Sequence, residues 1–528
     1  MQQPSKNSEH RAGNGDQAEV IAFLSDPASY TPQPERVERF ETHGALVFLA
    51  GDDAWKIKRA VRFPYMDFST LDRRRAVCAH EVEINRRLAP QIYLGCVPIT
   101  RTPDGHIEFG GRGAPIEWAV RMRRFDQAAL LSRMAQAGAL SAEEARDLAD
   151  VVYESHRTAQ PAAGVKGATR LERLVASVLA NLTDLHGVLD AGPLHELGER
   201  LTAAKHSAAR VLDERAAAGF VRRCHGDLHL NNIVIWHGRP VLFDAIEFDD
   251  DLATIDTLYD LAFLLMDLDQ RGQRAAANAV LNRYLWRSEA ALDLQGLRAL
   301  PLFLGLRSAI RAMVTAERCE QEHGEAQSRD RQAARRYLDA ARAYLAPAAP
   351  RLIAVGGLSG TGKSTLARVM APEIGPAPGA VHLRSDLERK SIFGTGETVP
   401  LGPDAYTRKA SETVYATLNE KMGHVLRAGH AGIVDAVFAK PAERAEIEAV
   451  AASLGVPFQG LWLEAPPEVL VDRVAARRGD ASDATPDVVR HQLAYRIGDL
   501  APSWTRVDAS AGAPATLARA RDAVGDRP

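Results

Sequence analysis

The chain has 528 residues, of which 46% are hydrophobic and 25% are charged, and its 65 Lys and Arg against 68 Asp and Glu give a formal charge of −3. A single hydrophobic core rarely extends beyond about 300 residues, so more than one folded unit is expected, and the composition excludes a mainly disordered or fibrous protein. The balanced charge excludes a global attraction to nucleic acid or anionic membranes.

The first part of the chain predicts a flexible tail followed by a two-lobed α+β unit at residues 21–345. Residues 1–20 are polar and small, and they lack an apolar signal segment. From about residue 34 to residue 120, short β-like runs surround one helical segment, which is typical of a small mixed α/β lobe. Helical periodicity then dominates from about residue 127 to residue 346, interrupted by a polar, β-rich insert at 221–248.

A linker rich in Pro and Ala at residues 346–350 separates this unit from a second one at residues 351–528. In the second unit apolar runs alternate with helical stretches, as they do in a parallel sheet with crossover helices. The predicted strands are Leu352–Val355, Val381–Leu383, Gly432–Val437, Gly460–Leu463 and Thr505–Val507. We therefore expect an α/β unit with a five-stranded parallel sheet.

The polar insert of the first unit contains a constellation suited to phosphate chemistry. His225-Gly-Asp227-Leu-His-Leu-Asn-Asn232 is followed by Val241-Leu-Phe-Asp244. Such a pattern supplies one base on a tight loop and two hard oxygen ligands for Mg²⁺, one of them across a short hairpin. Asp227 is the candidate to orient or deprotonate an acceptor hydroxyl. Asn232 and Asp244 are the candidate metal ligands.

These residues resemble the catalytic loop of the aminoglycoside phosphotransferase family, which has a protein-kinase-like fold. The resemblance implies ATP as the phosphoryl donor. Tyr259-Asp260-Leu-Ala262 resembles a later helix start of the same family, in which the residue equivalent to Asp260 braces the catalytic loop. The alternative is a polar hairpin with buried His and Asp side chains.

The resemblance also implies an ATP-binding lysine on the third strand and a glutamate partner on the next helix. Ala54-Trp-Lys56-Ile-Lys58 favours Lys56, although strand alternation leaves Lys58 on the same face. Glu81 lies on the buried stripe of the helix and is the expected partner, with a surface salt bridge as the alternative. Residues 118–122 resemble the hinge that meets adenine.

One expected element is nearly absent from the first unit. In place of a Gly-rich phosphate loop before the second strand, Glu41-Thr-His-Gly44 offers one glycine. Thr42 and His43 are candidates to contact phosphate instead. The alternative is a degenerate kinase fold that binds without catalysing.

The second unit opens on a phosphate-binding loop. Gly357-Leu-Ser-Gly-Thr-Gly-Lys363-Ser364 fits GxxxxGK[ST] and lies directly between a predicted strand and a predicted helix. Backbone N–H groups of such a loop close around phosphate oxygens, while Lys363 reaches the terminal phosphates and Ser364 ligates Mg²⁺. The candidate ATP-binding residues are Gly357, Ser359, Gly360, Thr361, Gly362, Lys363, Ser364 and Thr365. A Gly-rich turn without ligand is the alternative.

Further polar groups follow the next two predicted strands. Asp386 ends the second strand, and Arg389 comes one helical turn later, so the pair could accept a hydroxyl proton and hold the acceptor. Asp435 ends the third strand and is a candidate Mg²⁺ ligand. A helix N-cap is the alternative role for an Asp at a strand end.

A basic helix precedes a glycine-containing segment near the end of the chain. Arg473, Arg477 and Arg478 precede Gly479-Asp-Ala-Ser-Asp483. We expect these arginines to belong to a mobile lid that closes on the transferring phosphoryl group, with a solvated helix face as the alternative.

The second unit resembles the P-loop small-molecule kinases, among them gluconate kinase, chloramphenicol phosphotransferase, the zeta-toxin kinases and polynucleotide 5′-hydroxyl kinase. The resemblance covers about residues 350–525. Asp386 and Arg389 match the Asp-x-x-Arg acceptor motif of the polynucleotide kinases, and Arg473 and Arg477 match the lid arginines. The acceptor itself is not encoded in these motifs.

The chain is therefore expected to be a bifunctional ATP-dependent phosphotransferase, with ATP and Mg²⁺ at both sites and small hydroxyl-bearing acceptors. The alternatives are a P-loop kinase or ATPase regulated by a non-catalytic kinase-like module, and a nucleic-acid 5′-hydroxyl kinase. Nucleic acid is disfavoured by the balanced charge. Four cysteines without a Cys-x-x-Cys pair and the lack of a bilayer-length apolar run indicate a cytoplasmic protein without a membrane partner. The oligomeric state stays open.

Overall fold

The computed structural model describes residues 17–42, 44–63, 66–477 and 479–525. Most of the predicted tail lies outside these residues, and its last part, from Ala18, already belongs to helix α1 (Ala18–Ser25). Contacts group the chain into two compact units. The first comprises Met1–Leu140, Val151–Ala162 and Val221–Asp260, and the second comprises Ser141–Asp150, Ala163–Phe220 and Leu261–Pro528. The predicted linker at residues 346–350 stays a prediction.

The first unit is built on a six-stranded antiparallel sheet with the order β1-β2-β3-β8-β6-β7. Its strands are β1 (Val37–Glu41), β2 (Ala45–Ala50), β3 (Asp53–Lys58), β6 (Tyr93–Arg101), β7 (Ile107–Phe109) and β8 (Ala114–Arg123), and a separate pair is formed by β4 (Arg62–Phe63) and β5 (Met66–Asp67). Helix α2 (Leu71–Leu88) begins at Thr70, whose side chain accepts a hydrogen bond from the N–H of Arg73.

The two faces of this sheet bury different helices, as its strand alternation requires. Ala54 packs with Cys78 and Val82 of α2, whereas Trp55 and Ile57 pack with α1 on the other side. The even-numbered residues of β3 therefore face α2. This alternation directs both lysines of β3 toward the helix that carries Glu81.

The segment of the first unit that contains Asp227 and Asp244 consists of short strands joined by loops. Strand β9 (Val221–Arg223) pairs with β12 (Thr254–Asp256), and β10 (Ile233–Trp236) pairs with β11 (Arg239–Leu242). The two-residue turn of the second hairpin has φ values of 48° at His237 and 78° at Gly238, as a type I′ turn demands. Helices α3 (Leu131–Ala137) and α7 (Asp250–Ala253) complete the unit, and α4 (Ala142–Thr158) and α8 (Thr257–Gln270) are divided between the two units.

Helices form the first part of the second unit. They are α5 (Gly167–Asp184), α6 (Ala191–Ala217), α9 (Arg274–Ser288), α10 (Ala291–Gly296), α11 (Leu300–Gln321) and α12 (Gly324–Tyr344). Among the described residues, the stretch Ala291–Gln321 is long and apolar enough to cross a bilayer, but 72% of its most apolar window is buried inside the protein. That burial is typical of a core helix.

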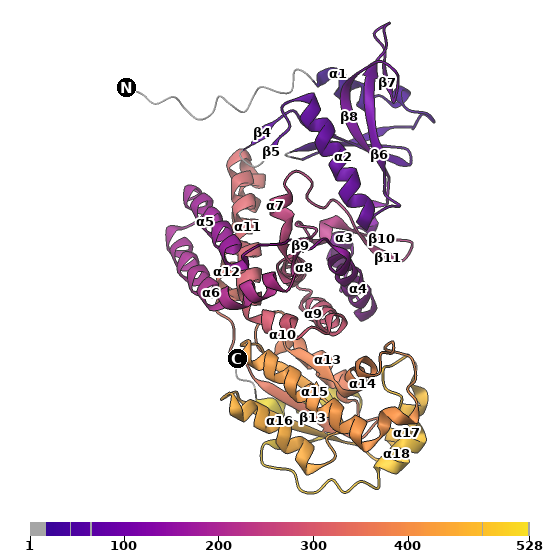
Figure 1. Cartoon of the computed structure of the whole chain (residues 1–528), viewed down its shortest axis with the longest axis vertical. Coiled ribbons are helices and arrows are strands. Elements are labelled where there is room, and N and C mark those ends of the chain that lie inside the picture. The colour runs from indigo at the N-terminus through magenta and orange to yellow at the C-terminus, as the bar shows by residue number, and fades with distance from the viewer. Residues whose placement is uncertain (1–16, 43, 64–65, 478, 526–528) are drawn as a thin grey trace. The chain divides into compact units, whose positions relative to one another are not determined.

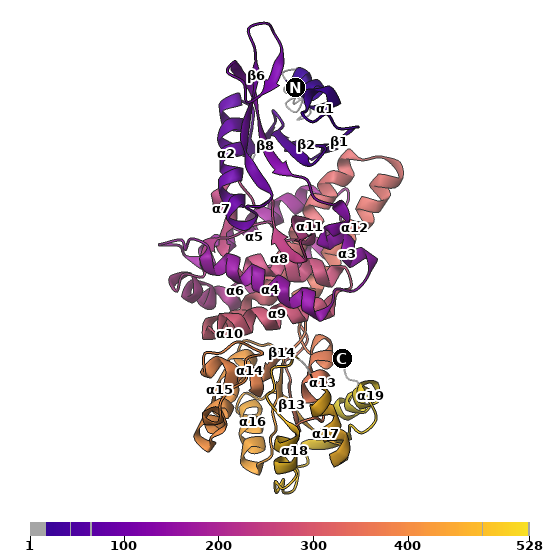
Figure 2. The ribbon, with the colours of Figure 1, turned by 90° about the vertical axis from the view of Figure 1, so that its right-hand side faces the viewer.

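The second unit continues as a parallel sheet with the order β14-β15-β13-β16-β17, which confirms the predicted five-stranded α/β arrangement. Its strands are β13 (Leu352–Gly357), β14 (Val381–Arg384), β15 (Gly432–Asp435), β16 (Phe458–Glu464) and β17 (Trp504–Asp508). Its helices are α13 (Lys363–Met370), α14 (Ser385–Ile392), α15 (Arg408–Arg427), α16 (Pro441–Ser453), α17 (Pro467–Ala476), α18 (Pro486–Gln492) and α19 (Ala513–Val524). Figure 2 shows α13 and α19 on one side of β13, with α15 and α16 on the other.

The register of this sheet determines which polar side chains meet. Arg384 at the end of β14 lies opposite Asp435 at the end of β15, and Val355 of β13 lies opposite Asp435 on its other side. Below this edge, Ile353, Leu366 and Ile433 belong to the buried core. The carboxyl ends of three strands therefore lie at the same sheet edge, where α/β sheets hold their ligands. Figure 1 shows β13 and α13, which the phosphate loop joins, in this part of the chain.

Candidate active sites

The first candidate site is organised by the loop between β9 and β10. The carboxylate of Asp260 accepts hydrogen bonds from the backbone N–H groups of His225, at 3.1 Å, and Gly226, at 2.9 Å. His156 Nε2 lies 3.1 Å from the same carboxylate. Gly226 has a φ of 84°, and a Cβ there would lie 2.9 Å from Ile246 Cδ1, so the turn requires glycine. The bracing role that the family resemblance implied for Asp260 is therefore present as a contact.

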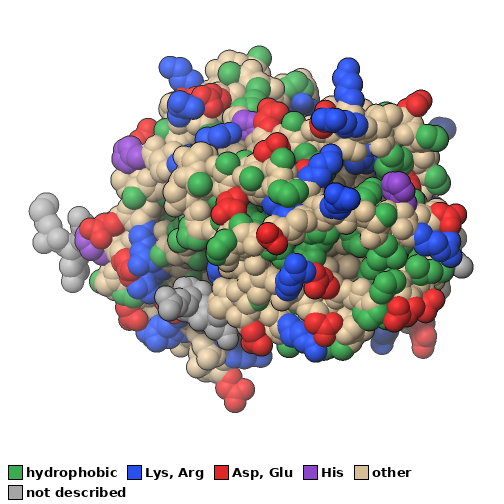
Figure 3. All heavy atoms as spheres, turned by 90° about the horizontal axis from the view of Figure 1, so that it is seen from below, with side chains coloured by type: hydrophobic (Ala, Val, Ile, Leu, Met, Phe, Trp, Pro, Cys, Tyr) green, Lys and Arg blue, Asp and Glu red, His purple; other side chains and the backbone are tan. Residues whose placement is uncertain are grey.

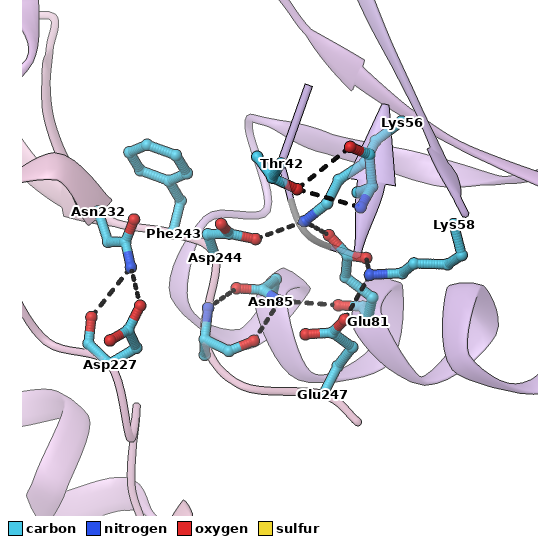
Figure 4. Close-up of polar contacts among 12 residues, drawn as sticks. Thr42, Lys56, Lys58, Glu81, Asn85, Asp227, Asn232, Phe243, Asp244 and Glu247 are labelled. Carbon is cyan, nitrogen blue, oxygen red and sulfur yellow. Dashed lines mark hydrogen bonds and ion pairs between the residues drawn. The ribbon is translucent and has the colours of Figure 1, made fainter. Parts of the chain in front are cut away.

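Asp227 and Asn232 lie side by side on this loop (Figure 4). Asn232 Nδ2 donates to the Asp227 Oδ2 atom and to its carbonyl oxygen, each at 3.0 Å. His229 Nε2 lies 3.3 Å from Asp227 Oδ2. Because the Asn232 amide nitrogen points at Asp227, its oxygen is left to act as a metal ligand. The Asp227 side chain remains 40% exposed, which leaves the carboxylate accessible to an acceptor.

Lys56 is held between two carboxylates. Its Nζ lies 2.8 Å from Glu81 Oε1 and 2.6 Å from Asp244 Oδ1. Burial alone would lower the pKa of Lys56. The neighbouring carboxylates, of which Asp244 has the largest effect, outweigh burial and raise the pKa well above the ordinary value. Asp244 has a φ of 62°, and its N–H donates to the Tyr93 hydroxyl at 3.1 Å. A permanent cation therefore stands beside the candidate metal carboxylate (Figure 4).

The second lysine of β3 forms its own buried cluster. Lys58 Nζ lies 2.6 Å from Glu81 Oε2 and also pairs with Glu247, and the Lys58 side chain is only 2% exposed. Both lysines therefore share Glu81, but among the described residues Lys56 is the one of the two that forms an ion pair with Asp244. These contacts favour Lys56 as the nucleotide lysine and give Lys58 a structural role.

Replacing Glu81 with glutamine is expected to destabilise the first unit strongly. The change leaves two buried ammonium groups short of one carboxylate, and breaking a buried pair costs about 3 kcal/mol or more. Thermal and urea unfolding, followed through the first unit's transition, measure the loss. Glu83→Gln, an exposed change on the same helix, is the matched control, and equal effects of the two changes would contradict the cluster's importance.

The same carboxylate predicts a pH dependence. Burial raises the pKa of Glu81, but Lys56 and Lys58 outweigh it and hold the folded-state pKa below the ordinary value. Its contribution to stability is therefore complete above the unfolded pKa of about 4.3 and is lost as the pH falls through the lower folded pKa. The difference in unfolding free energy between wild type and Glu81→Gln is expected to shrink from pH 7 to about pH 3, and a constant difference would contradict the assignment.

The replacement for the missing Gly-rich loop is only partly described. Thr42 Oγ1 accepts a hydrogen bond from the N–H of Ala45 at 3.0 Å, which closes the turn between β1 and β2. His43 lies outside the described residues.

Asn85 of α2 is a polar anchor that sequence reasoning missed. Its Oδ1 accepts a hydrogen bond from the N–H of Ala245 at 2.9 Å and so fixes the segment after Asp244 to α2.

The second candidate site begins with the loop between β13 and α13. Gly357, Gly360 and Gly362 have φ values of 139°, 89° and 89°, and a Cβ on Gly360 would lie 2.6 Å from the Leu470 carbonyl oxygen. This backbone path is closed to other residues. Thr361 Oγ1 and Lys363 Nζ both donate to the Leu358 carbonyl, at 2.7 and 3.0 Å. The loop therefore curls back on itself, as a phosphate cradle does.

The loop has two further features. The N–H of Ser359 donates to Gln492 Oε1 of α18 at 2.8 Å, a contact that sequence reasoning missed because 133 residues separate the two. Thr365 lies exposed on the first turn of α13. Gln492 therefore links the phosphate loop to α18, the helix that follows the predicted lid.

Asp435 is the centre of the polar cluster at the sheet edge. The hydroxyl of Ser364 donates to its carboxylate, and His382 Nε2 lies 2.8 Å from its Oδ1. Burial raises the pKa of Asp435, but His382, Arg384 and Ser364 outweigh it and lower the pKa to about 2. The carboxylate is therefore ionised at neutral pH and, with the Ser364 hydroxyl, offers the hard oxygens that Mg²⁺ prefers.

Lys363 lies in a strongly charged environment. Burial lowers its pKa below the ordinary value, the carboxylates of Asp435 and Asp386 oppose this effect, and Arg477 and Arg384 add to it. Asp386, in the first turn of α14, is thus one of the carboxylates that raise the pKa of Lys363. The structure brings together Lys363, Asp386, Asp435 and Arg477.

Arg389 lies in a different environment from the one expected for an exposed acceptor clamp. The residue is 8% exposed, its Nη1 donates to the Ala405 carbonyl, and its guanidinium stacks over the Tyr406 ring at 5.0 Å. The Tyr406 hydroxyl donates to Asp483 Oδ2 at 2.6 Å, and Lys390 Nζ lies 2.7 Å from Asp483. Arg389 and its neighbours therefore connect α14 to Asp483, in the segment predicted to form the lid.

The predicted lid arginines separate in the structure. Arg477 Nε lies 3.4 Å from Asp480, which also pairs with Arg384 at 3.0 Å. Arg473 instead donates to the Ser510 carbonyl at 3.3 Å. Arg478 lies outside the described residues. Of the arginines that can be placed, Arg477 is thus connected to the polar cluster at the sheet edge.

Two sequence families match the chain. Residues 46–300 match the family described as "Phosphotransferase enzyme family", and residues 352–497 match the family described as "AAA domain". Both matches confirm the resemblances carried by the catalytic loop and by the phosphate-binding loop.

Similar proteins span most of the chain. An uncharacterized protein of Mycobacterium tuberculosis strain H37Rv and one of Mycobacterium bovis are each 33% identical over 468 residues, covering 87% of this chain and 90% of theirs. A sugar kinase from Janibacter sp. HTCC2649 is 24% identical with a TM-score of 0.26, covering 33% of this chain and 94% of that one. The GDP complex of aminoglycoside 2′-phosphotransferase-IIIa is 15% identical with a TM-score of 0.38, covering 61% and 98%.

Proposed function

The chain belongs to the same family as these mycobacterial proteins and is an ATP-dependent kinase, and on that premise we propose that it is bifunctional. Each site transfers the γ-phosphoryl group of ATP to a hydroxyl of a small molecule. The first site is centred on Asp227 and the second on Lys363. The alternative is a P-loop kinase regulated by a non-catalytic kinase-like module.

The contacts of Lys56 carry the proposal for the first site. A kinase-like site is competent when its lysine is paired with the helix glutamate and its metal carboxylate is in place. Lys56 is 2.8 Å from Glu81 and 2.6 Å from Asp244, and this pairing supports a site in which Asp244 would hold the metal beside the lysine. A module that only binds has no need to hold this arrangement at the cost of burying the charges.

The residues at both sites divide the chemistry in the same way. Asp227 in the first site and Asp386 in the second accept the proton of the acceptor hydroxyl. Lys56 and Lys363 hold the charge of the phosphates. Mg²⁺ bound to ATP would neutralise charge on the β- and γ-phosphates. Its protein ligands would be Asn232 and Asp244 in the first site, and Ser364 and Asp435 in the second.

A small acceptor is favoured over a nucleic acid at the second site. On the face shown in Figure 3, Lys and Arg side chains are interspersed with Asp and Glu side chains outside the grey atoms. A long polyanion binds best to a continuous basic surface. The buried contacts of Arg389 also engage its guanidinium within the protein.

The cytoplasm is the location we propose. All four cysteines are free, and Cys78, Cys224 and Cys319 are buried. Unpaired thiols persist in a reducing compartment. ATP and Mg²⁺ are abundant there, as both proposed reactions require.

Phosphate transfer from γ-labelled ATP tests the proposal. The full chain is incubated with Mg²⁺ and separate pools of sugars, polyols, nucleosides and aminoglycosides, and with a 5′-hydroxyl oligonucleotide. We expect acid-stable phosphate monoesters of small hydroxyl compounds. Release of inorganic phosphate alone would indicate an ATPase, and labelling of the oligonucleotide alone would establish the nucleic-acid alternative.

A further inference from the structure

The second unit contains a cavity that shares His382 and Arg384 with the polar cluster around Asp435 but is not lined by the phosphate loop. Its volume is about 140 Å³, and its walls come from α9 and α10 on one side and from β14 and α14 on the other. Its apolar lining includes Ala279, Trp286, Leu294, Leu383 and Leu387. A dry cavity of about 150 Å³ accommodates one six-membered ring, so this space fits a small flat molecule.

The walls of the cavity are held by specific polar contacts. Strand β14 is an edge strand, and the side chains of α9 satisfy its free edge: Asn282 Oδ1 accepts from the N–H of His382 at 2.6 Å, and Asn278 Nδ2 donates to the Ala380 carbonyl at 3.0 Å. Arg283 lies 2.6 Å from Glu397, beyond β14, and its guanidinium stacks over the Trp286 ring at 4.5 Å. The space between these elements is therefore a built feature of the unit.

Two buried donors on the lining residues make no hydrogen bond within the described part of the chain. They are Trp286 Nε1 and Arg384 Nε, and the latter lies 4.0 Å from Asp435 Oδ1. An unsatisfied buried donor costs free energy that a ligand acceptor would recover. Five Arg and Lys residues line the cavity against three Glu residues, so a negatively charged acceptor is favoured.

We propose that this cavity binds a small ligand with one flat apolar ring and an anionic group, such as a carboxylate. The ring would pack against the apolar lining beside Trp286. The anionic group would accept hydrogen bonds from Trp286 Nε1 and from the Arg384 guanidinium.

The cavity is separate from the acceptor motif. Leu387 and Glu388 of α14 line it, whereas Asp386 and Arg389 lie on the other face of the helix, since each residue turns the helix by about 100°. His382 and Arg384 line the cavity and also lie within 2.8 and 4.0 Å of the Asp435 carboxylate. A bound anion would therefore act on the predicted metal ligand of the P-loop site, a consequence that rests on the proposed function of that site.

Binding of 4-fluorobenzoate to the full-length chain tests the cavity directly. We expect saturable broadening of its ¹⁹F resonance with wild type and at least about tenfold weaker binding with Ala279→Trp, which fills the space. Ala449→Trp, on the exposed face of α16, is the matched control and should bind as wild type does. Equal binding by Ala279→Trp and wild type would overturn the site.

Two further arms test the ligand class and guard against misfolding. Trp286→Phe keeps a ring but removes the N–H, so it should weaken binding about three- to tenfold without changing the melting temperature. Neutral 4-fluorobenzyl alcohol should bind at least about tenfold more weakly than 4-fluorobenzoate, and equal binding would overturn the anion preference. These readouts do not require ATP turnover, so they show whether the cavity binds the ligand even if the proposed kinase activity fails.

Discussion

Replacing Asp227 with asparagine is expected to lower phosphate transfer at the first site by about 10²- to 10⁴-fold, the usual range for removing a general base. The amide has the same shape as the carboxylate and can still contact Asn232 and His229, but it cannot accept the acceptor's proton. The loop should remain in place because Asp260 holds it through the N–H groups of His225 and Gly226. Steady-state kinetics in the Lys363→Ala background, where the first site acts alone, measure the effect.

Asp104→Asn is the matched control for this change. Asp104 is an exposed carboxylate in the turn between β6 and β7, and it has no part in the proposed chemistry. The control should leave kcat unchanged. If Asp227→Asn retained full activity in the Lys363→Ala background, the assignment of Asp227 as the base would be wrong.

Replacing Lys363 with alanine is expected to lower transfer at the second site by about 10²- to 10³-fold, the range seen when a charge-stabilising donor is removed. Lys363 supplies the positive charge at the end of the phosphate loop, beside the carboxylates of Asp386 and Asp435. Its loss leaves those carboxylates facing the phosphates without a neutralising ammonium. The effect is measured as ATP consumption in the Asp227→Asn background, where the second site acts alone.

Lys409→Ala, an exposed change on α15, controls for the general loss of a positive charge. In the Asp227→Asn background, Lys409→Ala should consume ATP as fast as the chain that has Asp227→Asn alone. A mutant of Lys363 that bound and consumed ATP normally would remove the P-loop from the catalytic account.

The local part of the first site could be predicted because its residues are close in sequence. Asp227 and Asn232 are five residues apart on one loop, and their contact follows from that spacing. The choice between Lys56 and Lys58 could not be made in this way, because residues two apart on a strand share a face. The choice needs the position of Asp244, which is 188 residues from Lys56 and comes within 2.6 Å of it only in the fold.

The second site shows the same limit. The phosphate loop is a contiguous motif and could be found from sequence, and so could Asp435 at the end of β15. Asp386 was expected at a strand end but lies in the first turn of α14, because β14 already ends at Arg384. The contacts of His382 and Arg384 with Asp435 depend on the register of β14 against β15. The alternation of polar and apolar residues in Val-His-Leu-Arg, residues 381–384, was an available signal for this cluster.

Helical spacing alone does not predict the contacts of the two lid arginines. Arg473 and Arg477 are four residues apart and were expected to act together, yet Arg473 donates to the Ser510 carbonyl while Arg477 pairs with Asp480. Arg477 follows the last residue of α17, so its side chain is no longer placed by the helix. The role of either arginine in transfer stays a prediction.

ATP consumption by four forms of the full-length chain, measured with Mg²⁺ and the acceptor pools, tests bifunctionality most directly. The forms are wild type, Asp227→Asn, Lys363→Ala and the double variant. Two active sites predict that each single variant keeps part of the turnover, with different acceptors consumed, and that the double variant keeps none. If Lys363→Ala alone abolished all turnover, the first unit would be a regulatory module and the proposal of two catalytic sites would be contradicted.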